Sequence, residues 1–219
     1  MKMKFDNRLE AGELLAAKLR KYSSRSDALV LALPRGGVPV GFIVAQRLHL
    51  PLDVIVVRKI GAPGNRELAS GALGTGGVQV MNEDLIAALQ LPSVAIDQVV
   101  AEEKRELERR ELIYCHGQPP PVVKNRTIIL VDDGIATGAT VRAAIAVLRS
   151  QAVGRIVLAT PVMAAATFAE MQGEADEIVA VLLPDEFYGV GRWYEDFSPT
   201  TDEEVQTFLA SATHVFSPP

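Results

Sequence analysis

Ile-Ile-Leu-Val-Asp-Asp-Gly-Ile-Ala-Thr-Gly-Ala-Thr-Val, residues 128 to 141, is the stretch of sequence that decides the fold. Its apolar start, ending at Val131, predicts a buried strand. Two acids, Asp132 and Asp133, follow at the carboxyl end of that strand, and a loop of small residues then opens directly into a helix. A strand, a short loop and a helix in this order are typical of α/β proteins with a parallel sheet.

The small residues of this loop predict an anion site beside the two acids. Short side chains let backbone N–H groups of the loop and the first helical turn close on a phosphate, and hydroxyls add donors. The carboxylates would repel that phosphate, so they need a different target nearby, and vicinal sugar hydroxyls can donate to them. The stretch therefore favours a phosphorylated sugar, with its phosphate at Gly134, Ala136, Thr137, Gly138, Ala139 and Thr140.

Composition fits one globular domain over residues 1–219. The chain is 48% hydrophobic and 22% charged, with a net charge of -5, which disfavours a nucleic-acid surface. The single cysteine, Cys115, rules out an internal disulfide and is compatible with a reducing cytoplasm. A polar amino terminus and the absence of an apolar run of about 20 residues predict a cytoplasmic protein without a membrane partner.

Apolar runs alternate with helical patterns along the chain, which predicts a doubly wound, mainly parallel five-stranded sheet with flanking helices. We expect a last helix to start at Thr201, because Thr201 and Glu204 form a capping box. The predicted strands are 28–33, 52–57, 127–131, 155–160 and 177–182. The other predicted helices are 8–21, 38–48, 93–114, 139–150 and 164–172.

The stretch 128–141 resembles the signature of the type I phosphoribosyltransferases, an apolar strand followed by two acids and a Thr-Gly-x-Thr ending. The resemblance implies that Asp132 and Asp133 contact the ribose hydroxyls of phosphoribosyl pyrophosphate (PRPP), and that the loop from Ala136 to Thr140 binds its 5-phosphate. It extends from about Ala28 to Phe197, but only the signature is specific by itself. An ordinary strand-loop-helix turn with solvated acids is the alternative.

Leu33-Pro-Arg-Gly-Gly-Val38 follows the first core strand and predicts a second anion site. Gly36 and Gly37 free the backbone amides to turn inward, and Arg35 can offer a guanidinium fork to a phosphate. In the resembled family a loop at this place binds pyrophosphate, which implies that role for these three residues. A plain strand-to-helix turn is the alternative.

Arg58 and Lys59 leave an apolar strand together, and cations at a buried strand end need a compensating anion. A leaving pyrophosphate provides one, and protein carboxylates are the alternative. The resembled family commonly has a basic pair here, with its lysine on the pyrophosphate, which favours Lys59 as a catalytic contact beside Arg35, Asp132 and Asp133.

Residues 61–80 are rich in glycine and predict a flexible lid with a charged tip at Arg66 and Glu67. Such a loop covers the active site in the resembled enzymes. The alternative is a β-hairpin arm used for dimer contact.

Residues 184–219 predict a small carboxyl-terminal hood whose aromatic side chains can stack on a flat heterocycle. Phe187, Tyr188 and Trp193 are the acceptor-binding candidates. Pro-Asp-x-Phe followed by Val-Gly and Asp-Phe is similar to the hood of the hypoxanthine-guanine branch, where the Phe stacks on the base and the Asp assists magnesium; this implies a metal role for Asp196. A small aromatic core is the alternative.

The acceptor stays open, because two positions depart from the hypoxanthine-guanine pattern. Ala136 stands where that branch has an acid beside the base, and ungapped counting places Ala175 where it has a lysine. Ala136 agrees better with the adenine branch, whereas the hood does not.

The resemblance implies a PRPP-dependent phosphoribosyltransferase of nucleotide salvage that releases pyrophosphate, with Mg²⁺ as cofactor and a homodimer as assembly. Mg²⁺ would contact Asp132, Asp133 and Asp196 indirectly or through water. A non-catalytic regulatory protein that binds PRPP is the alternative. A P-loop NTPase is disfavoured, because the chain has no Gly-x4-Gly-Lys-Ser/Thr motif.

Overall fold

The chain is divided into two compact units in a computed structural model that describes residues 4–115 and 119–215. The first unit comprises Met1–Val54, Val123–Gly138 and Val153–Pro219. The second comprises Ile55–Val122 and Ala139–Ala152. The single domain expected over 1–219 stays a prediction, and residues 216–219 of the expected hood lie outside the described residues.

A five-stranded parallel sheet is the centre of the first unit, as the sequence predicts. Its strands lie in the order β2 (Leu52–Val54), β1 (Ala28–Ala32), β6 (Thr127–Val131), β7 (Arg155–Val162) and β8 (Glu177–Leu182). The three central strands are apolar and almost wholly buried, because helices cover both faces of a parallel sheet. Ala32 is paired with Val131, and Val131 with Ala159, so the carboxyl ends of β1, β6 and β7 are level.

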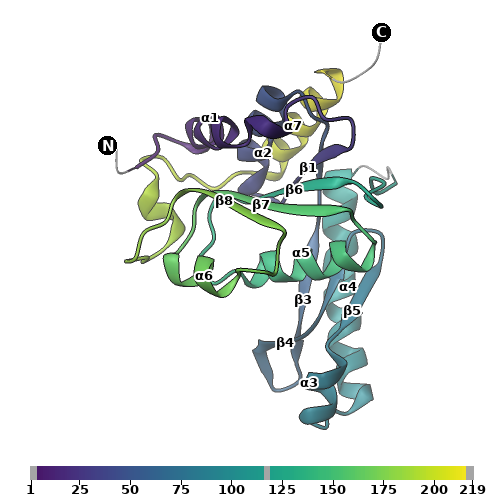
Figure 1. Cartoon of the computed structure of the whole chain (residues 1–219). Helices are drawn as coiled ribbons and strands as arrows, with labels where there is room; N and C mark the ends of the chain where they lie inside the picture. The colour runs from purple at the N-terminus through teal and green to yellow at the C-terminus, as the bar shows by residue number, and fades with distance from the viewer. Residues whose placement is uncertain (1–3, 116–118, 216–219) are drawn as a thin grey trace. The chain divides into compact units, whose positions relative to one another are not determined.

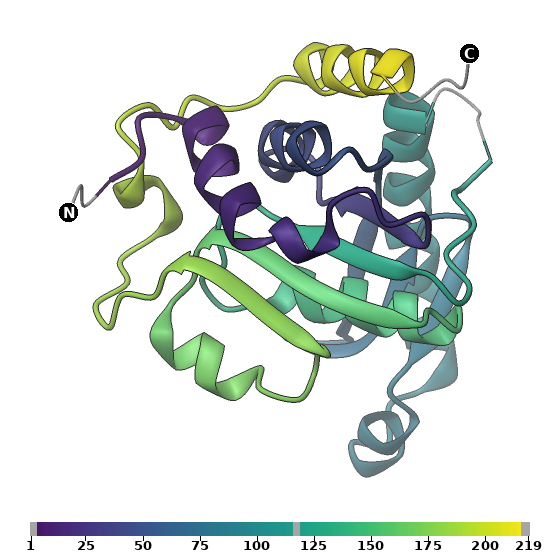
Figure 2. The ribbon, with the colours of Figure 1, turned by 45° about the horizontal axis from the view of Figure 1, so that its top comes forward.

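Helices of the first unit lie on both faces of its sheet (Figures 1 and 2). α1 (Arg8–Lys18), α2 (Gly37–Leu48) and α7 (Asp202–Val215) lie on one face, and α6 (Ala165–Glu170) lies on the other. Side chains define the helix starts: the Asn7 side chain accepts from two amides of α1, and Thr201 and Glu204 form the expected capping box of α7. The main core lies between α1, α2 and the sheet, and includes Leu15, Leu19, Val40, Val44, Val30, Ile129 and Val157.

An antiparallel sheet is the centre of the second unit, with β3 (Val57–Ala62), β4 (Asn65–Gly74) and β5 (Val78–Met81) in that order. α3 (Glu83–Ala88) follows β5, and α4 (Ser93–Cys115) and α5 (Ala139–Ser150) pack on the sheet. The structure differs here from the expected flexible lid loop, since most of residues 61–80 belong to regular strands. Backbone pairing of β4 with both neighbours explains the difference, and it agrees with the β-hairpin alternative.

The predicted strand 52–57 is in fact two strands. β2 ends at Val54, and β3 begins at Val57 in the other sheet. Between them the Val56 amide donates to the Thr75 hydroxyl at 2.8 Å and the Val56 carbonyl accepts from the Thr75 amide at 2.9 Å. These bonds hold the chain where it passes from the first unit to the second, and an apolar run alone does not reveal such a change of sheet.

Candidate active site

The two signature acids lie at the carboxyl end of β6, where the sequence places them. The Asp132 amide donates to the Ala159 carbonyl of β7 at 3.3 Å, and the Asp133 amide donates to Oδ1 of Asp132 at 2.9 Å. Both residues are half-buried. The neighbouring strand and this local bond therefore fix the backbone that presents the two carboxylates.

The glycine loop after β1 lies directly against these acids. A Cβ atom on Gly36 would stand 2.0 Å from Oδ2 of Asp133, and one on Gly37 would stand 2.7 Å from the Val131 carbonyl oxygen. Only glycine allows so close an approach at these two positions. The predicted pyrophosphate loop and the predicted ribose acids thus form one cluster, because β1 and β6 are neighbours in the sheet. The peptide bond between Pro34 and Arg35 is cis.

Arg35 already has an anionic neighbour from the carboxyl-terminal helix. Its Nη1 lies 3.7 Å from Oδ1 of Asp202, in the first turn of α7, and half of its side chain is exposed. A long, partly exposed ion pair of this kind contributes little to stability, at most about 1 kcal/mol. The guanidinium can therefore exchange this partner for a phosphate at small cost.

Arg8 is a site residue that sequence reasoning missed. Its Nε donates to Oδ2 of Asp133 at 2.8 Å, and its side chain is only 11% exposed. The Tyr194 hydroxyl also reaches this acid, and donates to the Asp133 carbonyl oxygen at 2.6 Å. An isolated bridge pairs Phe5 with Tyr194, which brings the segment before α1 and the segment after β8 together beside the signature. No local pattern around Arg8 reveals this, because its partner lies 125 residues away.

Burial sets the charge balance of the two acids. It raises the pKa of Asp132 well above its ordinary value, and the neighbouring Asp133 charge adds to the rise. Burial also raises the pKa of Asp133, while the Arg8 guanidinium opposes that rise. Perturbed acids gathered at the carboxyl ends of parallel strands are typical of a functional site.

The expected phosphate loop has a buried base and an exposed rim. Its base is Ile135, whose amide donates to the Val162 carbonyl and whose own carbonyl accepts from the Ala164 amide. Ala136 and Thr137 are exposed, and Gly138 has a φ of 74°. Ala139 and Thr140, also exposed, begin α5 in the second unit. The rim thus offers backbone groups and a hydroxyl to an anion.

In the second unit, the two residues of the basic pair, Arg58 and Lys59, have different surroundings. Arg58 bonds Glu103 of α4, with Nε and Nη2 at 2.7 and 2.6 Å from Oε2, as the carboxylate alternative expects. Lys59 instead lines a cavity of about 320 Å³, together with Arg142 and Asn82. At the expected lid tip, Arg66 lies 3.5 Å from Glu102, and the Glu67 side chain lies outside the described residues.

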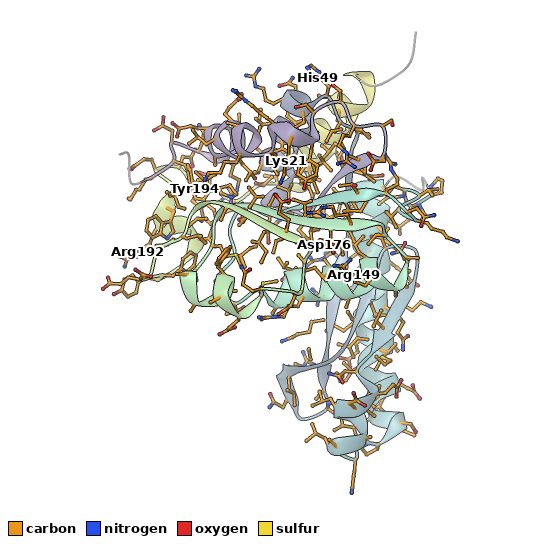
Figure 3. The ribbon with its side chains drawn as sticks, in the orientation of Figure 1. Lys21, His49, Arg149, Asp176, Arg192 and Tyr194 are labelled. Carbon is orange, nitrogen blue, oxygen red and sulfur yellow. The ribbon has the colours of Figure 1, made fainter. Side chains whose placement is uncertain are left out.

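The hood forms an aromatic cluster. Phe187 stacks near Trp193, with ring centroids 6.5 Å apart, and both pack against the small core around Phe5 and Tyr194 (Figure 3 labels Tyr194). Tyr188 is 74% exposed, and the Arg192 guanidinium lies 5.4 Å from its ring. Of the three acceptor candidates, Tyr188 is therefore open to a ligand, whereas Phe187 and Trp193 also fit the aromatic-core alternative.

Oxygen donors of the kind that magnesium prefers occur in the signature and in the hood. Asp132 and Asp133 present hard carboxylate oxygens. Asp196 accepts from the hydroxyl and amide of Ser198, and these bonds lower its pKa. Within residues 4–115 and 119–215, no group of three or more His, Cys, Asp or Glu side chains is placed to hold a metal.

None of the helices in the described parts of the chain is both long and apolar enough to cross a bilayer.

Known proteins resemble the chain in sequence and in structure. A model of the phosphoribosyl transferase domain family matches residues 5–179. Two Mycobacterium tuberculosis proteins, from strains CDC 1551 and H37Rv, are each named "Putative phosphoribosyl transferase" and are 43% identical over 213 residues, 97% of this chain. The chain spans about half the length of these relatives, 48% of each. The crystal structure of TT1426 from Thermus thermophilus is 40% identical, with a TM-score of 0.87 over 95% of this chain and 99% of that one.

Proposed function

Because this chain belongs to the phosphoribosyl transferase family, we propose that it transfers the 5-phosphoribosyl group of PRPP to a nitrogenous base or similar acceptor, with release of pyrophosphate. One observation carries the proposal: the signature acids and the glycine loop are in direct contact, with the carboxylate of Asp133 lying against Gly36. Carboxylates for a sugar and amides for a phosphate thus meet at one end of a parallel sheet, where α/β proteins usually bind ligands.

Each part of PRPP has a matching group. The ribose 2- and 3-hydroxyls donate to Asp132 and Asp133. The 5-phosphate is held by amides from Ala136 to Thr140 and by the amino terminus of α5, which carries a partial positive charge. The pyrophosphate binds the amides of Gly36 and Gly37 and the cation Arg35. Lys59, in the second unit, is proposed as a pyrophosphate contact on the family resemblance alone. We assign no pyrophosphate contact to Arg58, since Glu103 already holds it.

The reaction breaks the bond between the anomeric carbon and the pyrophosphate oxygen, and the bonding electrons leave with pyrophosphate. A lone pair on an acceptor nitrogen forms the new bond, and that nitrogen then loses its proton to water. Positive charge builds on the ribose beside the two carboxylates while negative charge builds beside Arg35 and the glycine amides. Catalysis of this kind rests on position and electrostatics, and needs no covalent nucleophile.

Magnesium would supply neutralisation of the leaving pyrophosphate. Asp132 and Asp133 are the residues that would hold it, indirectly or through water. Asp196 is the weaker candidate, because Ser198 already donates two hydrogen bonds to one of its oxygens.

Two measurements test the proposal. The purified chain is first titrated with PRPP and Mg²⁺ in a calorimeter, and we expect binding. It is then incubated with PRPP, Mg²⁺ and a panel of purine and pyrimidine bases, and we expect the nucleotide of at least one base. Absence of PRPP binding rejects the proposal. Binding without product from any acceptor tried would favour the regulatory alternative.

A further inference from the structure

The Arg8 side chain is fixed on three sides. Its Nε donates to Oδ2 of Asp133 at 2.8 Å, and its Nη1 donates to the Ser198 carbonyl oxygen at 2.8 Å. Its guanidinium carbon lies 4.0 Å from the centroid of the Phe197 ring. A planar guanidinium suits this combination, because it forms directed hydrogen bonds at its edge and stacks through its face. Arg8 therefore ties the hood to the signature acid.

Asp133 is held on its other sides as well. Gly36 leaves no space beyond Oδ2, and the Tyr194 hydroxyl bonds the Asp133 carbonyl. A carboxylate has about four acceptor sites, so the bond to Arg8 leaves capacity for a ligand hydroxyl. An acid beside a pyrophosphate loop also repels the substrate unless a cation balances its charge. Arg8 meets both needs, since it fixes the carboxylate and compensates its charge.

We propose that Arg8 is a positioning residue of the ribose site, which acts on the substrate through Asp133. This inference rests on the proposed function, and it assigns a role to the amino-terminal helix. In this role Arg8 holds Oδ2 of Asp133 so that the remaining acceptor sites of the carboxylate face a ribose hydroxyl. Arg8 itself contacts no substrate.

A purely structural role predicts something different. If Arg8 only joins α1 to the hood, its loss lowers the melting temperature and leaves ligand preference unchanged. If it positions Asp133, its loss weakens ligands that carry ribose and spares inorganic phosphate, which reaches only the amide loops. The ratio of ribose 5-phosphate affinity to phosphate affinity separates the two roles.

The test compares wild type with Arg8→Met, Arg8→Lys and a matched control, Arg25→Met. Arg25 also bonds an aspartate, through Nε and Nη2 to the two oxygens of Asp27 at 3.0 and 2.8 Å, but it lies at the amino ends of the strands. Affinities for PRPP with Mg²⁺, ribose 5-phosphate and inorganic phosphate are measured by calorimetry, beside thermal unfolding of each variant.

We expect Arg8→Met to weaken ribose 5-phosphate and PRPP about tenfold or more, since a charge-assisted hydrogen bond that fixes the acid is lost. Phosphate affinity should stay within about twofold of wild type, as should every affinity of Arg25→Met. Arg8→Lys keeps the charge but not the fork, and should weaken ribose 5-phosphate by about threefold or more. If Arg8→Met does not fold, Arg8→Lys alone decides.

Equal weakening of all three ligands, or unchanged ribose 5-phosphate affinity in the folded Arg8 variants, overturns the inference and leaves the proposed function standing. If wild type binds neither PRPP nor ribose 5-phosphate, the proposed function and the inference fail together. The two failures are therefore distinguishable.

Discussion

The acids at the amino ends and at the carboxyl ends of the strands in the five-stranded sheet differ in how their charges are compensated. At the amino ends of the strands, Asp27 and Glu177 are well paired: Arg25 and Thr127 lower the pKa of Asp27 to about 2. Burial acts to raise the pKa of Glu177, but hydrogen bonds from Lys21, Tyr22 and Arg155 bring it below its ordinary value. At the carboxyl ends, Asp132 and Asp133 have raised pKa values and share one cation, Arg8. Figure 3 labels Lys21, which bonds Glu177, and Tyr194, whose hydroxyl bonds the Asp133 carbonyl.

This difference indicates that the acids at the amino ends of the strands serve stability, whereas those at the carboxyl ends serve ligand binding. Each acid of the amino end is paired with at least one cation and one hydroxyl, so these groups are satisfied without any ligand. The acids of the carboxyl end are undercompensated, and a substrate hydroxyl or a magnesium ion would complete them. Stable proteins tolerate such incomplete pairing mainly at functional sites. The comparison predicts that equivalent substitutions at the two ends affect different properties.

The largest expected effect is on PRPP binding. Asp132→Asn with Asp133→Asn should abolish it, because hydrogen bonds to charged groups contribute about 1.5–3 kcal/mol each and two such acceptors are lost. The same pair of changes at the other end, Asp27→Asn with Glu177→Gln, should leave the Kd within about twofold. Calorimetry with Mg²⁺ measures both, and thermal unfolding checks that each variant is folded. Unchanged PRPP affinity in the first variant would reject the ribose site.

A single methyl group added at a glycine should also have different effects at the carboxyl ends and at the amino ends of the strands. In Gly36→Ala the new Cβ overlaps the Asp133 carboxylate, so the acid must move and PRPP affinity should fall at least about tenfold, by the order of the 1–3 kcal/mol that overpacking costs. In Gly154→Ala the new Cβ would stand 2.9 Å from the Asn125 carbonyl oxygen, in the loops before β6 and β7. That variant should lose thermal stability and keep its PRPP affinity. Calorimetry and thermal unfolding of both variants decide, and equal PRPP losses would contradict the comparison.

The sequence predicts the site residues at the carboxyl ends of the strands better than the contacts that support them. Asp132, Asp133, Gly36 and Gly37 were identifiable because each follows a buried strand, and the carboxyl ends of parallel strands meet at one edge of a sheet. Such a local rule requires no knowledge of the rest of the chain. A mainly parallel sheet of five strands follows from the same alternation of apolar runs and helices, whereas the end of β2 at Val54 does not.

Arg8 and Tyr194 could not be identified in that way. Each meets Asp133 where the segment before α1 pairs with the segment after β8, through the bridge between Phe5 and Tyr194. The partner of Arg58 was likewise open, since a cation at a strand end fits a ligand or a carboxylate equally well until α4 brings Glu103 to it. The glycine content of residues 61–80 predicts a loop. Composition alone does not show that β4 pairs with a strand on each side, and this pairing makes the segment a sheet.

The smallest effect we expect is a difference in the pH dependence of stability. The folded pKa of Glu177 is lowered, so its contribution is present above its ordinary value of 4.5 and is lost as pH falls through the folded pKa. Glu177→Gln should therefore cost about 1 kcal/mol near neutral pH, the upper end for a partly exposed ion pair, and progressively less below about pH 4.5.

Asp132 should show the opposite sign. Its folded pKa is raised, so its contribution is present below its ordinary value of 3.8 and is lost as pH rises through the folded pKa. Relative to wild type, Asp132→Asn should then become more stable as pH rises, whereas Glu177→Gln becomes less stable. Denaturant unfolding of wild type, Asp132→Asn and Glu177→Gln from about pH 3 to about pH 8 measures how the free energy of unfolding of each protein depends on pH. This range includes the ordinary pKa values of carboxyl groups. If the free energy of unfolding of both variants, relative to wild type, changed with pH in the same direction, the acids at the two ends of the strands would be equally compensated. The proposed electrostatic difference between the two ends would then be wrong.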